Sequence, residues 1–466
     1  MQTFRPGLFL ALLLFILGGS LSPPCALGNH QSLTGPFADV RAVTEQCLSC
    51  HARQGEDILQ SSHWTWERSR LIGTERRTFA KRTGLTTFAV SVTANPSRCM
   101  TCHISTTLLS GRHDPSAAAD IDCLVCHDTT GTYQRVLGAP VNTLDLPRIA
   151  ANVGTPRPAN CLTCHGRECG LTGLRGHGGF DDEVHLHYTG AALSCQQCHP
   201  GQGKHDMQRR LVPDEQDLQH AGCIACHSSS PHSRTQLNSH GTTLACQTCH
   251  IPMHGRTTPA LVSWNWLYGS GMTVDQHTQQ PTPFLTADGM TMATNLLPTY
   301  LWDAGGDRIY ERGGRIEPEK LNHLLAPIPR DQTAQIRPFS VLLGTQLYDD
   351  RYRYLISPAL TRAAPTFFSD AEWDQIAAEG MNNLRLPFSG SLGFTTTVSF
   401  RRLNHGVVPS AQALDCMDCH GKAGRFPWTA LGYTSDPWSD SNVPGRSGEK
   451  TAPPPAAPLP MSEQTP

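Results

Sequence analysis

Cys246-Gln247-Thr248-Cys249-His250 is one of eight pentapeptides in this 466-residue chain in which a Cys-x-x-Cys pair is followed at once by histidine. Such a pentapeptide is the attachment site of c-type haem, because its two thiols bond to the porphyrin and its imidazole ligates the iron. The paired cysteines are Cys47 and Cys50, Cys99 and Cys102, Cys123 and Cys126, Cys161 and Cys164, Cys195 and Cys198, Cys223 and Cys226, Cys246 and Cys249, and Cys416 and Cys419. The adjoining histidines are His51, His103, His127, His165, His199, His227, His250 and His420.

These pairs use all but two of the 18 cysteines, since only Cys25 and Cys169 stand outside them. Cys-x-x-Cys pairs also occur in zinc knuckles and in thioredoxin-like sites, and exported proteins often form disulfides. None of these alternatives explains why a histidine follows every pair. The sequence therefore predicts eight covalently attached haem c groups, each with its iron ligated by the histidine of its own motif.

The amino-terminal residues 1–28 have the pattern of a secretory signal peptide. Arg5 precedes an apolar run at residues 8–17, and the small residue Gly28 indicates cleavage near Asn29. A run of ten apolar residues is well short of the roughly 20 that span a bilayer, although an uncleaved anchor is an open alternative. We expect export to the periplasm and a mature chain that does not span the membrane.

The carboxyl-terminal residues 443–466 are rich in proline and have little apolar surface to bury, so they are predicted to form a disordered tail. This leaves residues 29–442 as the octahaem cytochrome domain. The formal net charge of −2 indicates no nucleic-acid partner. Two propionates on each haem would make the protein strongly acidic unless arginines pair with them.

Seven motifs lie within residues 47–250, and the eighth follows at 416–420 after a haem-free segment, residues 251–415. Because the motifs recur too closely for a conventional core, we expect the packed haems to form the interior. We predict a mainly α fold with much irregular structure. Each motif should lie at the end of a short helix, since the thiols and the histidine must share one turn.

The haem-free segment carries more ordinary signals. A capping box at residues 369–372 predicts a helix over residues 370–384 that ends before Pro387. Residues 341–343 and 394–398 are predicted to form short strands. The segment must fold back so that the eighth haem joins the others, and we therefore expect one compact domain.

Histidines are numerous enough to supply second axial ligands. Eight of the 22 belong to the motifs, which leaves 14. A haem that only transfers electrons usually has a second strong ligand, whereas an iron without one can bind substrate. For any single residue a surface or hydrogen-bonding role is the alternative, but so large an excess favours distal ligation. The 14 are His30, His63, His113, His177, His185, His187, His205, His220, His232, His240, His254, His277, His323 and His405.

Several stretches resemble the octahaem tetrathionate reductase family of periplasmic cytochromes, which is related to hydroxylamine oxidoreductase and to multihaem nitrite reductases. The haem number, the long gap before the eighth motif and the overall length agree with that family. The matching stretches are Ser62-His63-Trp64-Thr65-Trp66-Glu67, Asn95-Pro96-Ser97-Arg98-Cys99, residues 123–133, residues 244–251, and Asn404-His405-Gly406.

The resemblance implies a mostly helical, haem-dominated fold in which the second haem is catalytic and the other seven irons each carry two histidines. His103 would then hold the iron that meets substrate. The distal ligands carried over by position are His63, His177, His185, His205, His232, His240 and His405.

One position departs from the family. A lysine that precedes the histidine equivalent to His177 approaches the catalytic iron in the family, and Arg175 stands there in this chain. A guanidinium stays protonated and has no lone pair for iron, so it cannot replace that amine as a ligand. Three outcomes are open: an accessible iron with Arg175 holding an anion, another sixth ligand such as Cys169 or His113, or a differently aligned loop. For Cys169 an inert buried thiol is the simpler alternative.

The resemblance implies reduction of tetrathionate, nitrite or hydroxylamine at the second haem. Arg175 would hold the anionic substrate, and His113 or Asp114 would deliver protons. The implied partners are a small inorganic substrate and a redox partner cytochrome or quinol-linked donor. Two alternatives are an electron relay with eight six-coordinate irons and a hydroxylamine oxidase. The oxidase would need a tyrosine cross-linked to the porphyrin, with Tyr348, Tyr352 and Tyr354 available.

Overall fold

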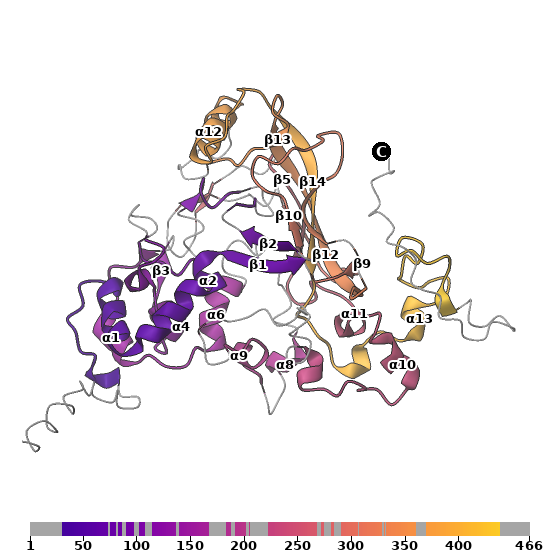
Figure 1. Cartoon of the computed structure of the whole chain (residues 1–466), viewed down its shortest axis with the longest axis horizontal. Helices are drawn as coiled ribbons and strands as arrows, with labels where there is room; N and C mark the ends of the chain where they lie inside the picture. Colours follow the sequence, from indigo (N-terminus) through magenta and orange to yellow (C-terminus); the bar gives the residue numbers. More distant parts are fainter. Residues whose placement is uncertain are drawn as a thin grey trace, which may run out of the picture.

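The structure is a computed structural model, and the motif-bearing helices gather near one end of the strands of a large β-sheet in it (Figure 1). The predicted signal peptide 1–28 and the predicted tail 443–466 lie outside the described part. Within that part, no helix has both the length and the apolar character that crossing a membrane requires. The described residues are 30–72, 75–80, 83–85, 90–96, 102–107, 114–136, 139–166, 183–187, 192–201, 205, 222–267, 272–274, 281–283, 290–305, 307–328, 330, 332–359 and 370–438.

Most motifs lie on short helices, as the sequence predicted. α1 (Val40–Gln60) runs through the first motif and is kinked at His51, whose φ of −113° and ψ of 37° are not helical. Cys99 of the second motif lies outside the described residues. The other motifs lie on α4 (Leu124–His127), α6 (Pro158–His165), α9 (Cys195–Cys198), the 3₁₀ helix η5 (Cys223–Ala225), α11 (Cys246–His250) and α13 (Cys416–Cys419).

Further short helices carry the spare histidines or connect the motifs. These further helices are η1 (His30–Ser32), α2 (Ser62–Thr65), η3 (Ala118–Asp120), α5 (Leu146–Ala151), α8 (Val184–His187), α10 (Thr235–His240) and η7 (Ser410–Gln412). Capping side chains fix where two of the helices begin: Asp39 accepts a hydrogen bond from the Ala42 N–H at the start of α1, and Asp145 accepts one from the Arg148 N–H at the start of α5.

An eight-stranded sheet is built from the haem-free segment. Its longest strand, β12 (Gln335–Asp349), pairs antiparallel with β14 (Leu392–Arg402) from Phe339↔Arg402 to Asp349↔Leu392. The main strand order is β10-β11-β14-β12-β5-β8, and β9 and β13 also pair with β12. The remaining members are β5 (Ala260–Asn265), β8 (Met290–Ala293), β9 (Thr299–Asp303), β10 (Asp307–Ile309), β11 (Asn322–Pro327) and β13 (Tyr354–Leu355).

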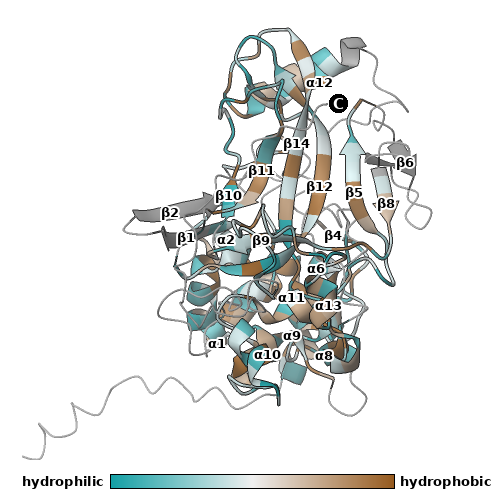
Figure 2. Cartoon of the chain, turned by 90° about the vertical axis from the view of Figure 1, so that its right-hand side faces the viewer, coloured by the Kyte–Doolittle hydropathy of each residue, from teal (hydrophilic) through white to brown (hydrophobic). Residues whose placement is uncertain are grey.

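The sheet has its own apolar core. Leu342 and Leu347 of β12 are fully buried, and Figure 2 shows apolar residues along β12 and β14. α12 (Asp370–Asn383) packs on this core through Trp373, Ile376 and Met381. Three two-stranded hairpins complete the strands: β1 (Glu67–Ile72) with β2 (Glu75–Ala80), β3 (Arg135–Val136) with β4 (Ala139–Pro140), and β6 (Met272–Val274) with β7 (Pro281–Pro283).

The predicted helix at 370–384 is confirmed, and both predicted strands exist but are longer than expected. The prediction of a mainly α fold is correct for the motif-bearing part and wrong for residues 251–415, where the sheet dominates. Strand pairing joins residues far apart in sequence, such as Phe339 and Arg402. Local periodicity carries little information about such pairs, which explains why their extent was underestimated.

The sheet also positions haem motifs. Backbone hydrogen bonds join Ile336 of β12 to Thr243 and Ala245 just before the seventh motif, and the Thr248 hydroxyl donates to the Ile336 carbonyl. Beyond β14, the Val408 N–H donates to the His250 carbonyl. The haem-free segment therefore returns the chain from the sheet to the motifs and brings His405 and the eighth motif beside them.

Candidate haem and redox site

Seven motif histidines each lie opposite a second imidazole. The distances between ring centroids fall in the narrow range 6.1–6.3 Å, although the partners come from widely separated parts of the chain. The pairs, motif histidine first, are His51 with His30, His127 with His205, His165 with His63, His199 with His405, His227 with His185, His250 with His232, and His420 with His240.

This spacing fits one iron between each pair of rings. Imidazole nitrogens bind transition metals at about 2 Å, and each nitrogen lies roughly 1 Å from its ring centroid. Two bonds and two half-rings therefore span about 6 Å. A direct imidazole–imidazole hydrogen bond would bring the rings closer, so the observed separation leaves room for one metal ion between the two rings of each pair.

The orientation and protonation of several rings suit the same role. Nδ1 of His127 lies 2.8 Å from the Gly154 carbonyl, which leaves Nε2 for the metal. Burial lowers the pKa of His127, His240 and His250, and it lowers that of His405 to about 4. These imidazoles are therefore neutral near pH 7, which is the form that binds metal.

His103 of the second motif has different surroundings. Its ring is 2 % exposed and lies edge-on to Trp66, with 3.8 Å between centroids, and 5.6 Å from Trp64. Nδ1 accepts a hydrogen bond from the Ser105 N–H at 3.1 Å, and Nε2 lies 3.0 Å from the Trp64 carbonyl oxygen. To ligate iron through Nε2, this ring must exchange the Trp64 carbonyl for the metal.

A buried polar cluster borders the second motif. The Arg135 guanidinium donates to the His103 carbonyl at 2.8 Å and lies 3.6 Å from the Asp122 carboxylate. Asp122 also accepts a 2.6 Å hydrogen bond from the Tyr133 hydroxyl. Burial raises the pKa of Asp122, and the Arg135 charge acts in the opposite direction. This cluster fixes a positive charge beside the backbone of the second motif.

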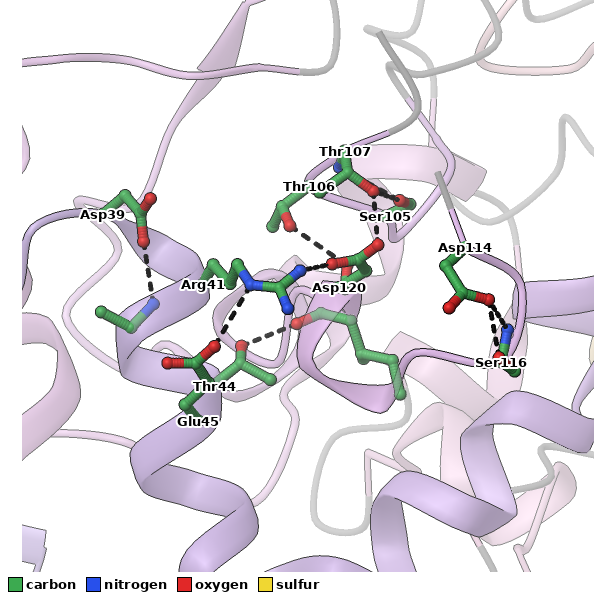
Figure 3. A network of polar contacts seen from close by, with 12 residues as sticks. Asp39, Arg41, Thr44, Glu45, Ser105, Thr106, Thr107, Asp114, Ser116 and Asp120 are labelled. Carbon is green, nitrogen blue, oxygen red and sulfur yellow. Dashed lines mark hydrogen bonds and ion pairs between the residues drawn. The ribbon is translucent and has the colours of Figure 1, made fainter. Parts of the chain in front are cut away.

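A second network connects the first and second motifs (Figure 3). Asp120 is 1 % exposed and accepts hydrogen bonds from Arg41 of α1 and, at 2.6 Å, from the Thr107 hydroxyl. The Thr44 hydroxyl donates to the Ile121 carbonyl at 2.6 Å. α1, the loop after His103 and the segment that leads to the third motif are thereby held together.

The motifs themselves adjoin one another in a continuous run. The Cys47 and Cys123 thiols are within hydrogen-bonding distance, as are Cys161 with Cys195 and Cys223 with Cys246. Electrostatic interactions link Cys126 with Cys164, Cys198 with Cys226, and Cys249 with Cys419. The motif order along this run is therefore first, third, fourth, fifth, sixth, seventh and eighth.

The second motif branches from this run at the fourth. The Cys102 sulfur lies 4.0 Å from the Cys164 carbonyl, and the Cys164 sulfur lies 3.9 Å from the Cys102 carbonyl. A porphyrin at the second motif would thus adjoin the one at the fourth, near the middle of the chain of haems.

Six of the histidines predicted as distal ligands lie in the pairs described above. The seventh paired residue, His30, was counted among the spare histidines but was not chosen as a ligand. His30 directly follows the predicted cleavage site near Asn29, and the sequence carried no signal that marked it as a ligand. Four predicted site residues lie outside the described residues: His113, Cys169 and Arg175 of the second haem pocket, and the predicted distal ligand His177.

The tyrosines considered for a porphyrin cross-link belong to the sheet region. The Tyr354 hydroxyl donates to the Pro387 carbonyl, and the Tyr348 hydroxyl donates to Asp350 at 3.1 Å. Tyr352 stacks on Tyr354 with 5.5 Å between ring centroids. These contacts give all three a structural role and do not favour the oxidase alternative.

Comparisons with known proteins agree with this description of a multihaem c-type cytochrome. The family model for bacterial cytochrome c matches residues 262–423. A crystal structure titled octaheme cytochrome c from Shewanella oneidensis is 33% identical in sequence, with a TM-score of 0.77 over 89% of this chain and 99% of that one. No curated protein matches. The chain belongs to the octahaem c-type cytochromes, which confirms the resemblance drawn from the sequence, and it carries covalently bound haem c.

Proposed function

We propose that this cytochrome is an exported, periplasmic oxidoreductase. It reduces tetrathionate or a small nitrogen compound, such as nitrite or hydroxylamine, at the second haem, and the other seven haems deliver the electrons. The observation that carries the proposal is the contrast between motif histidines. Seven of them face a second imidazole at 6.1–6.3 Å, whereas among the described residues the ring contacts of His103 are with Trp64 and Trp66.

The paired imidazoles suit electron transfer. Two neutral nitrogen ligands hold an iron six-coordinate in both oxidation states, so little reorganisation accompanies each electron. The adjoining motifs would keep neighbouring porphyrins close together along the whole run. The branch at the fourth motif gives the second haem access to electrons that arrive from either end.

The surroundings of His103 suit a reacting centre. When bound there, the haem supplies a metal that takes up substrate and passes on electrons. The chain supplies a shielded pocket wall through the indoles of Trp64 and Trp66. Arg135 places a buried positive charge beside the motif backbone. Arg175, predicted from sequence as the anion-holding group, would add a charge-assisted hydrogen bond to an anionic substrate.

The test is spectroscopy of the purified holoprotein followed by turnover with a reduced dye. We expect a high-spin ferric signal from one haem in eight, binding of nitric oxide or nitrite to that haem, and reduction of at least one of the three compounds. An entirely low-spin spectrum without turnover would identify the protein as an electron relay instead.

Arg175 offers a sharper test of substrate binding. We expect Arg175→Ala to lower kcat/KM for an anionic substrate by about 10²-fold or less, since one charge-assisted hydrogen bond contributes roughly 1.5–3 kcal/mol. Arg175→Lys keeps the charge but restores the amine of the family, so it separates loss of charge from a change in the iron's ligands. Turnover by the alanine variant at the rate of the parent protein would remove Arg175 from the site.

A further inference from the structure

Four paired imidazoles are anchored through Nδ1 by acceptors of two kinds. His127 and His232 meet neutral oxygens: the Gly154 carbonyl at 2.8 Å for the first, and the side-chain amide of Asn238 at 3.2 Å for the second. His185 and His420 instead meet carboxylates, each at 2.6 Å. The haem sites therefore differ in the charge of the group that contacts Nδ1 of a ligand histidine.

The carboxylate behind His420 is held firmly. Asp436 Oδ1 also accepts the Trp438 N–H at 2.9 Å, and Oδ2 accepts the Gly421 N–H at 2.7 Å. The side chains of His420 and Asp436 are only 12 % and 14 % exposed, so water screens their interaction weakly. Three donors converge on this carboxylate and fix both its position and its ionised form.

The carboxylate behind His185 is built in the same way. Glu183 is 4 % exposed, and its Oε2 accepts the N–H groups of Gly406 and Val407 at 2.9 and 3.1 Å. Those residues directly follow His405, the partner of the fifth motif. Glu183 therefore orients a ligand of the sixth haem and also anchors the loop that carries a ligand of the fifth.

We propose that Asp436 and Glu183 lower the reduction potentials of the eighth and sixth haems. An imidazole whose Nδ1–H is donated to a carboxylate becomes a more basic ligand, which stabilises ferric over ferrous iron. The neutral acceptors of His127 and His232 carry no full negative charge, so they should have a smaller effect on the third and seventh haems. The inference rests on the proposed axial pairs and not on the proposed substrate.

The arrangement has a consequence for electron flow. The eighth motif lies at one end of the run and is held to the seventh by a 3.0 Å hydrogen bond from the Leu414 N–H to the Cys249 carbonyl. The seventh haem has the neutral Asn238 acceptor behind His232. An electron placed on the eighth haem therefore moves downhill to the seventh, whereas the next step to the sixth haem, whose potential Glu183 lowers, is uphill.

The experiment is a redox titration of the full holoprotein, resolved into eight one-electron components and run without substrate. We expect Asp436→Asn to raise the midpoint potential of one component and Glu183→Gln to raise that of another. Asn238→Asp is the reciprocal variant, since it places a carboxylate behind His232, and it should lower one component. Haem content of eight per chain checks that each variant is assembled.

Asp415→Asn is the matched control. Asp415 caps α13 beside the eighth motif by accepting the Met417 and Asp418 N–H groups, and an asparagine keeps the cap. It removes the same charge without touching an imidazole, so its shift in midpoint potential should be smaller than that of Asp436→Asn.

An equal shift in this control would overturn the proposal. Unchanged potentials in Asp436→Asn and Glu183→Gln would overturn it too, as would an upward shift in Asn238→Asp. If one variant fails to take up its haems, the other two still decide. Absence of turnover in the parent protein would count against the proposed function alone.

Discussion

The imidazole planes of His232 and His250 lie within 13° of parallel, with 6.2 Å between their centroids. The rings of His63 and His165 are equally far apart, at 6.3 Å, but stand almost perpendicular at 84°. Ring orientation decides which iron d orbitals each ligand overlaps. Parallel imidazole planes overlap with the same iron d orbital and separate its energy from that of the other d orbitals. Perpendicular planes each overlap with a different d orbital, so the two orbitals stay nearly equal in energy.

This difference predicts two kinds of low-spin ferric signal. The seventh haem should give a rhombic electron paramagnetic resonance spectrum, and the fourth should give a strongly anisotropic one with a single large g value. His63→Ala should remove part of the anisotropic signal and add a high-spin one, while His232→Ala should do the same to a rhombic signal. A spectrum in which both variants deplete the same signal would contradict the assigned ring angles.

His30 is predicted to be the distal ligand of the first haem. Its ring lies 6.1 Å from that of His51, and the sequence alone had placed His177 in the ligand set. His30→Ala should leave eight attached haems, because the thioether bonds are untouched, but convert one from low-spin to high-spin. His187→Ala, a change outside the seven pairs, is the control. An unaltered absorption spectrum in His30→Ala would show that another residue ligates the first iron.

Asp303 is predicted to be a main stabilising residue of the sheet. Its buried carboxylate accepts a 2.6 Å hydrogen bond from Arg402 of β14 and lies 3.4 Å from Arg337 of β12. Asp303→Asn would leave the buried Arg337 guanidinium without its carboxylate and Arg402 with Asp307 alone, and breaking such a buried pair typically costs roughly 3–5 kcal/mol. The expected result is a lower thermal unfolding midpoint at pH 7. Asp350→Asn, on an exposed turn, should change it little.

The same carboxylate predicts a pH dependence. Burial acts to raise the pKa of Asp303, but the hydrogen bond and charge of Arg402 outweigh it and hold the pKa below its ordinary value. A depressed folded-state pKa adds stability that is complete above the unfolded value of about 3.9 and is lost as the pH falls through the folded value. The midpoint difference between the parent protein and Asp303→Asn should therefore shrink in acid. A difference that stays constant below pH ~4 would rule out this mechanism.

Asp120 is predicted to couple the first and second motifs. Asp120→Asn weakens the contact with Arg41 and the 2.6 Å bond from Thr107 in a buried network, so we expect a loss of about 1–3 kcal/mol in stability. Asp114→Asn changes an exposed carboxylate that accepts the Ser116 N–H at 2.8 Å, and its effect should stay within about 0.5 kcal/mol. Chemical denaturation followed by circular dichroism compares the two. Equal midpoints for both variants would show that the network is not coupled to folding.

The sequence by itself determined the chemistry that is local in the chain. A Cys-x-x-Cys-His pentapeptide carries both thiols and one ligand within a helical turn, so the haem number, the attachment cysteines and the motif histidines follow from spacing alone. The helix at 370–383 is local in the same sense, because hydrogen bonds four residues apart build it.

Only the tertiary structure decided which residues meet across the chain. His405 comes to lie opposite His199 because β14 returns the chain to the motifs, and Asp436 reaches His420 because the last described turn folds over α13. Such contacts depend on the folding of the whole molecule. No short sequence pattern records them, so the pairing of seven motif histidines and the carboxylates beside His185 and His420 had to come from the fold.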